Sequence, residues 1–149
     1  MNPIKYLQEN GVKRAIKVLY DYKLEILLEK IMFVFTKHKK LNDVIMIESH
    51  NDFDCNGGAF YNYLIKNGYN EKYKIVWLVR KKSEMKLPEN VETVPLYGPC
   101  FRKAYYVCTA KYFTYDCENV QKMRKDQIMV YCGHGAGGLK SVKGKVPIP

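Results

Sequence analysis

The sequence predicts an α/β protein: a Rossmann-like parallel sheet with helices on both faces over residues 41–149, preceded by a basic amphipathic helical segment over residues 1–40. Length and composition allow this, because 149 residues with 47% hydrophobic side chains can bury one ordinary core. Near residue 40 the apolar pattern changes from helical spacing to short β-rich runs. These runs have continuous apolar centres and alternate with helical stretches, which is typical of parallel strands buried on both faces.

The first segment carries its apolar residues at helical spacing. Steps of three or four residues join Val12, Ile16, Leu19, Tyr22 and Ile26, with lysines between them. Residues 1–40 hold nine Lys and Arg against four Asp and Glu, so the helix has a partly basic face. Such a helix can lie on an anionic membrane surface, where apolar burial and the attraction of lysines to headgroups add together. The alternative is a helix that packs on its own domain and keeps its lysines in water.

The rest of the chain alternates between strand and helix patterns. Gly68 closes the first predicted helix of this region, and Pro88 lies in a loop between two strand-like runs. The predicted strands are 43–49, 72–80, 90–97, 111–117 and 126–133, and the predicted helices are 57–68 and 100–110. Ligands of such sheets bind outside the carboxyl ends of the strands, so the segments that follow strands are the candidate sites.

Two segments qualify. The first is "SHNDFDCNGG", residues 49–58, an exposed polar loop that contains His50, Asp52 and Asp54 and leads into a helix. The second is "GHGAGGLKSVKGK", residues 133–145, where glycines would let backbone N–H groups approach a phosphate and lysines would complete an anion site.

Histidine is the candidate for proton transfer. The imidazole of His134, between two glycines at the end of a strand, could take a proton from a substrate hydroxyl near neutral pH. The alternative is a histidine that caps the turn or bonds to a backbone carbonyl. His50 is a weaker candidate for the same role. For Asp52 and Asp54, capping of the helix and loop solubility are the alternatives to ligand binding.

Composition also excludes several classes. No uninterrupted apolar run exceeds five residues, so we expect no transmembrane helix, and without a signal-peptide pattern we expect a cytoplasmic protein. The five cysteines lack metal-ligand spacing, and we expect them reduced and the protein free of metal sites. Basicity is confined to the two ends and is not interleaved with aromatics, which argues against nucleic-acid binding.

The order of four segments resembles the CDP-glycerol glycerophosphotransferase family of teichoic-acid and capsule polymerases. These segments are "VIMIESHNDFDCNGGAFYNYL", "YKIVWLVR", "FRKAYYVCTAKYFTYD" and "QIMVYCGHGAGGLKSV". The last resembles the family's "WHGTPLK"-like motif, onto which His134 and Gly135 carry over directly. Gly133 stands where that motif has tryptophan, "AGG" stands where it has Thr-Pro, and Lys140 comes one residue late.

The resemblance implies a two-domain GT-B fold, of which this chain would supply the amino-terminal, acceptor-side half, with the carboxy-terminal donor domain absent. It implies attack of an acceptor hydroxyl on the β-phosphate of CDP-glycerol or CDP-ribitol, with no other cofactor. His134 would act as general base or orient the acceptor, with Lys140 and Lys143 attracting phosphate and Asp52 and Asp54 binding hydroxyls.

The expected partners are a lipid-linked polyol-phosphate or saccharide acceptor, the missing donor domain and an anionic membrane, with the protein peripheral on its inner face. We expect the isolated chain to be inactive. The alternative function is a non-catalytic Rossmann-like module that binds a nucleotide or polyanion.

Overall fold

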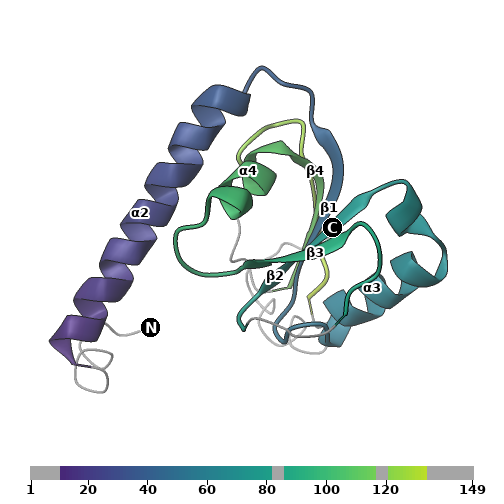
Figure 1. Ribbon diagram of the computed structural model, residues 1–149, viewed down its shortest axis with the longest axis horizontal. Helices are drawn as coiled ribbons and strands as arrows, with labels where there is room; N and C mark the ends of the chain where they lie inside the picture. The colour runs from purple at the N-terminus through teal and green to yellow at the C-terminus, as the bar shows by residue number, and fades with distance from the viewer. Residues whose placement is uncertain (1–10, 82–85, 117–120, 134–149) are drawn as a thin grey trace, which may run out of the picture.

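The computed structural model describes residues 11–81, 86–116 and 121–133 (Figure 1). It contains every helix and strand that the sequence predicts within these ranges. The order is α2 (Val12–Thr36), β1 (Asn42–Glu48), α3 (Cys55–Lys66), the 3-10 helix η1 (Tyr69–Glu71), β2 (Lys74–Val79), β3 (Val91–Pro95), α4 (Phe101–Thr109), β4 (Ala110–Tyr115) and β5 (Ile128–Tyr131).

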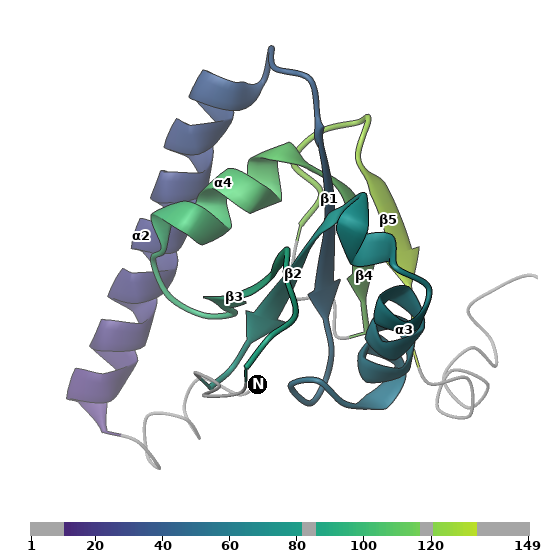
Figure 2. The same ribbon diagram turned by 45° about the vertical axis from the view of Figure 1, so that its right-hand side comes forward.

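All strand pairs are parallel, in the order β3-β2-β1-β4-β5. Helix α3 covers one face of the sheet and α4 covers the other, while α2 lies outside α4 (Figure 2). The predicted Rossmann-like parallel sheet with helices on both faces is therefore confirmed.

Alternation along the strands builds two apolar cores. Met46 and Phe113 point to the α4 side, where they pack with Val107 of that helix. Ile47 and Trp77 point to the α3 side, among the aromatic and aliphatic side chains of that helix. The central strands are buried on both faces, which explains their continuous apolar sequence.

Helix α3 begins two residues before the predicted start, at Cys55, because the Asp54 side chain accepts a hydrogen bond from the Cys55 N–H at 2.7 Å. It ends at Lys66, and Gly68 then takes a left-handed conformation with φ of 68°. The η1 turn occupies the following residues, so β2 starts at Lys74, two residues later than predicted.

Helix α2 is fixed to the domain by polar contacts. Glu25 accepts hydrogen bonds from the Lys103 ammonium and from the Gly98 N–H, the latter at 2.9 Å. Lys103 is only 3% exposed and also donates to the Leu96 carbonyl. Further along, the Cys108 thiol contacts the Glu29 carbonyl oxygen at 3.4 Å. The helix therefore packs on its own domain, as one of the two sequence interpretations holds.

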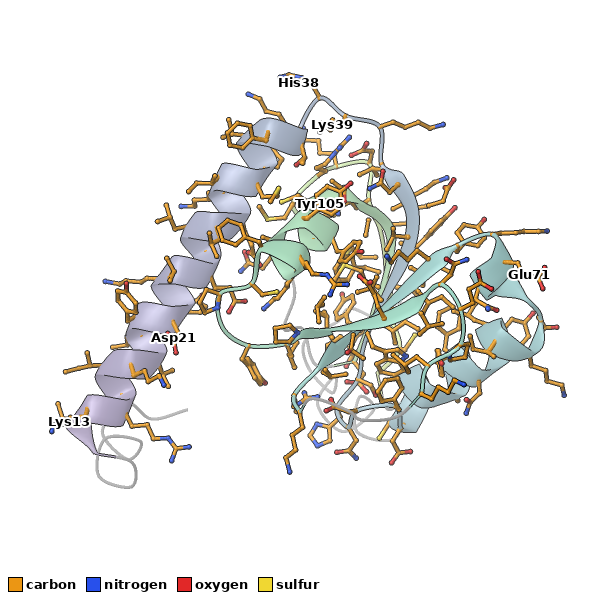
Figure 3. All side chains as sticks on the ribbon, in the orientation of Figure 1. Lys13, Asp21, His38, Lys39, Glu71 and Tyr105 are labelled. Atoms are coloured by element: carbon orange, nitrogen blue, oxygen red, sulfur yellow. The ribbon has the colours of Figure 1, made fainter. Side chains whose placement is uncertain are left out.

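The apolar positions predicted for α2 are nevertheless mostly in solvent. Val12, Ile16 and Leu19 are each about 60% exposed or more, and Lys13 lies at the far end of the helix (Figure 3). The exposed apolar residues of α2 are Val12, Ile16, Val18, Leu19, Tyr20, Tyr22, Leu27, Ile31, Val34 and Phe35. Within the described residues, no helix combines the length and apolar content required to cross a bilayer.

Candidate functional site

Polar residues gather where the parallel strands end. Ser49 follows β1, Arg80 follows β2, Asp116 follows β4 and Cys132 follows β5. Because the strands are parallel, all four positions lie at the same edge of the sheet, the place where Rossmann-like folds bind their ligands. We call this set, together with the loop Ser49–Asp54, the carboxyl-edge site.

An ion pair between a buried acid and a partly exposed arginine forms its base. The Glu48 side chain is fully buried, and its Oε1 lies 3.3 Å from Nη2 of Arg80. The other carboxylate oxygen accepts a hydrogen bond from the Asp116 N–H at 3.2 Å. The Arg80 guanidinium also donates to the Ser49 carbonyl. One acid at the end of β1 thus joins the ends of β2 and β4.

Asp52 holds the loop against β2. Its carboxylate accepts hydrogen bonds from the Arg80 N–H, at 2.9 and 3.0 Å to the two oxygens, and from the Lys81 N–H at 3.0 Å. Its Oδ1 also lies 3.9 Å from Arg80 Nη1. The sequence singled out Asp52 as a substrate ligand, and these contacts give it a role in fixing the loop.

Ser49 joins the loop to β4. Its buried hydroxyl lies 2.9 Å from the Asp54 carbonyl oxygen and 3.0 Å from Asp116 Oδ2. A hydroxyl carries one proton and can donate it to only one of these acceptors at a time. The Asp54 side chain caps α3, as the alternative interpretation of this residue proposes.

The beginning of α3 fits closely under the loop. A Cβ on Gly57 would lie 2.7 Å from the Cβ of Ser49, and a Cβ on Gly58 would lie 2.6 Å from the backbone oxygen of Phe53. Phe53 itself has a φ of 59°, and its ring packs on Trp77. The paired glycines therefore let the loop fold back onto the helix.

The structure brings three of the seven predicted site residues together. Asp52, Asp54 and the exposed His50 share the loop after β1. The other four, His134, Gly135, Lys140 and Lys143, lie outside the described residues, which continue to Gly133 just after β5. The Asn56 side chain donates to the Cys132 carbonyl at 2.6 Å, so the loop and the end of β5 are neighbours.

Sequence reasoning missed Glu48, Ser49, Arg80 and Asp116. Each is the last residue of a predicted strand or lies next to its end. The rule that carboxyl ends of parallel strands meet at one edge would have grouped them, because each lies at the carboxyl end of a predicted strand.

The described part of the site is acidic. Glu48, Asp52, Asp54 and Asp116 lie here with one arginine, Arg80, whose guanidinium contacts Glu48 and Asp52. Burial, with the nearby charge of Asp116, raises the pKa of the Cys132 thiol above its ordinary value of 9.0. In the described ranges, no three His, Cys, Asp or Glu side chains are grouped so that they could hold a metal ion. Asp54, which is exposed, can still accept a hydrogen bond from a ligand that donates one.

A match to a family's sequence model identifies the family of this chain. Residues 30–143 match the model of CDP-glycerol:poly(glycerophosphate) glycerophosphotransferase, which covers most of the chain. The chain belongs to this family. The matched range includes the whole sheet, the carboxyl-edge site and the segment with His134. A search of curated proteins finds no match.

Solved structures agree on the fold. The chain is similar to the wall teichoic acid polymerase TagF, with a TM-score of 0.59 and 17% identity. It is also similar to a TagF variant in which alanine replaces a histidine (TM-score 0.56, 18% identity) and to a histidine-to-asparagine variant soaked with CDPG (TM-score 0.57, 17% identity). Each match covers 83% of this chain and 32% of the other, so this chain spans about a third of the length of TagF.

Proposed function

We propose that this chain is the acceptor-side domain of a CDP-alditol phosphotransferase that builds teichoic-acid-like or capsular polymers. The acceptor is a lipid-linked polyol phosphate or saccharide, and the donor is CDP-glycerol or CDP-ribitol. The observation that carries the proposal is the family match, which spans the acid-lined carboxyl-edge site and the adjoining His134 segment.

In the proposed reaction, an acceptor hydroxyl oxygen forms a bond to the β-phosphorus of the CDP-alditol. The bond from that phosphorus to the bridging oxygen breaks, so CMP leaves with the electron pair and a phosphodiester remains. His134, one residue after Gly133 at the end of β5, takes the hydroxyl proton or orients the acceptor. Gly135, next to it, would leave room for the phosphate.

Charge supports the division between acceptor and donor. The carboxylates of the carboxyl-edge site favour hydroxyl donors, with Asp52, Asp54 and His50 beside the acceptor, and they repel a diphosphate. Binding of the donor then requires cations from elsewhere. Lys140 and Lys143 supply two, and a carboxy-terminal donor domain, as in a GT-B enzyme, supplies the rest.

Helix α2 supports a peripheral position on the inner face of an anionic membrane. The helix carries exposed apolar residues together with exposed lysines such as Lys13, and this combination binds lipid surfaces through burial and charge together. A lipid-linked acceptor would then reach the domain from the same surface.

The test is transfer by a protein that joins this chain to a donor domain. His134→Ala should lower the single-turnover rate at saturating acceptor about 10²- to 10⁴-fold while the thermal melt is unchanged. Lys140→Ala should instead raise the KM for the donor, with an effect that shrinks at high salt. An unchanged rate in His134→Ala would show that the histidine takes no part in the reaction. An unfolded variant would show that the histidine is needed for folding instead.

A further inference from the structure

A groove lined by aromatic side chains runs between α3 and strands β4 and β5. Its volume is about 300 Å³. The side chains that matter here are Phe60, Tyr63, Tyr69, Tyr73, Tyr112 and Val130. Because α3 lines the groove, it lies on the α3 face of the sheet, and Figure 2 shows α4 and α2 on the opposite face.

The groove is open because of the way the chain crosses the sheet. Within the described residues, α3 is the only α-helix on this face, and it returns from β1 to β2. Gln127, in the described part of the connection that leads into β5, donates to the carbonyls of Val107 and Ala110 on the other face. Ile128 and Val130 of β5 are therefore each 47% exposed.

Four tyrosine rings form a continuous row along the groove. Ring centroids are 6.1 Å apart for Tyr63 and Tyr69, 6.3 Å for the stacked pair Tyr69 and Tyr73, and 5.8 Å for Tyr73 and Tyr112. The Lys111 ammonium lies 5.1 Å from the Tyr112 ring centroid at the end of the row. Tyr63 is 55% exposed and Tyr69 37%, so these two rings are available to a ligand.

A second hollow extends the row at the η1 end. It has a volume of about 280 Å³ and is lined by Tyr63, Asn67, Gly68, Tyr69 and Lys72. Tyr63 and Tyr69 line both hollows, so the two lie next to each other along the row of rings. This end combines ring faces with an ammonium group and an amide, and Figure 3 shows Glu71 at the same turn.

At its other end the groove approaches the carboxyl-edge site. Thr114 and Val130 line it, two residues before Asp116 and Cys132 respectively. Asn56, one helical turn before Phe60 of the groove, bonds to the Cys132 carbonyl of that site. A chain lying in the groove would therefore have one end directed toward the proposed reaction centre.

We infer that this groove binds the polyol-phosphate polymer that the proposed reaction extends, and the inference rests on that proposed function. Ring faces accept the C–H groups of a polyol, as they do other apolar surfaces. Phenolic hydroxyls and the Lys72 and Lys111 ammoniums donate hydrogen bonds to phosphate oxygens. Several weak contacts along one track give affinity that grows with the number of repeats.

Salt should weaken this binding only modestly. Lys111 lies 3.9 Å from Asp43, and Glu71 is next to Lys72, so the net charge along the groove is small. Contacts to the tyrosine rings then contribute more to binding than contacts to the phosphates. Dissolved ions do not screen the ring contacts.

The experiment is calorimetric titration of the full 149-residue chain with a purified, lipid-free poly(glycerol phosphate). Tyr63→Ala with Tyr69→Ala should weaken binding about tenfold or more. Tyr20→Ala removes a tyrosine on α2 that is more exposed than either of these, at 65%, and should leave the Kd unchanged. Lys72→Gln, an exposed change that should not alter folding, is expected to weaken binding about two- to fivefold at low salt and less at high salt.

Three results would overturn the inference. The first is an unchanged Kd in the double tyrosine variant, or equal losses in Tyr20→Ala. The second is tyrosine-dependent binding of a neutral saccharide chain or of single-stranded RNA as tight as that of the polymer. The third is a tyrosine variant that loses binding only because it unfolds, as its thermal melt would show, together with an unchanged Kd in Lys72→Gln. Failure here with a His134-dependent transfer reaction intact would remove the groove and leave the proposed function standing.

Discussion

Gly58 sets how closely the loop after β1 packs on α3. An exposed helical glycine replaced by alanine gains about 1 kcal/mol from helix propensity. Gly58 is buried, and its new Cβ would lie 2.6 Å from the Phe53 backbone oxygen, which cannot rotate away. We expect Gly58→Ala to lower the free energy of unfolding by about 1–3 kcal/mol, measured by urea titration. Stabilisation by the alanine would show that the loop shifts without cost.

The neighbouring Ala59 provides the control, because it is exposed in the same turn of the helix. Ala59→Gly should cost about 1 kcal/mol through propensity alone. The two opposite exchanges should therefore both destabilise the protein, and only a close contact at Gly58 explains that result.

Individual residues also mark the limit of sequence reasoning. Asp54 could be recognised as a helix cap because a cap acts on its own neighbours. The hydrogen bonds from the Arg80 and Lys81 N–H groups to Asp52 span 28 residues or more, and the contact between Glu48 and Arg80 spans 32. No local sequence pattern encodes contacts between residues so far apart in the chain. The loop could therefore be predicted from the sequence, but the hydrogen bonds and the ion pair that hold it could not.

At the scale of elements, strands and helices could be predicted because burial on both faces leaves unbroken apolar runs. The orientation of α2 on the domain could not be predicted from the sequence. Its apolar residues lie all around the helix, and the face that packs on α4 contains Glu25, whose partner Lys103 is buried and distant in sequence. The tyrosine groove could not be predicted from the sequence either, because its rings come from separate elements, α3, η1, β2 and β4 or the residues beside them.

Glu29, in the interface of α2 with α4, should make stability depend on pH. Burial raises the pKa of its carboxyl above the ordinary 4.5, Lys103 lowers it and Glu25 raises it. A raised pKa in the folded state means stability that is present below pH 4.5 and lost as the pH rises through the folded value. Glu29→Gln should therefore raise the Tm relative to wild type at pH 7, and the difference should vanish near about pH 4.

A melt series from pH 4 to pH 8 would measure this. The matched change Glu71→Gln, at an exposed position in η1, should show no such trend. A Glu29→Gln curve parallel to wild type at every pH would contradict the assignment of the raised pKa.

The outward face of α2 should bind anionic vesicles. Ile16→Ser with Leu27→Ser removes two exposed apolar side chains and should weaken sedimentation with such vesicles about tenfold or more. Since both residues are exposed, the melt should change little. Ile128→Ser, on the opposite side of the sheet, is the control. Equal sedimentation of all three proteins would make α2 a structural helix only.

For the molecule as a whole, the distribution of charge predicts which substrate the chain holds. The carboxyl-edge site carries four carboxylates and one guanidinium, while the basic residues concentrate at the two ends of the sequence. We expect the 149-residue chain to bind an acceptor fragment such as a short glycerol phosphate oligomer, and to bind CDP-glycerol at least about a hundredfold more weakly. It should transfer nothing from CDP-glycerol by itself. Tight binding of CDP-glycerol, or turnover by the purified chain, would place donor recognition in this domain. It would contradict the proposal that this domain binds the acceptor while a second domain binds the donor.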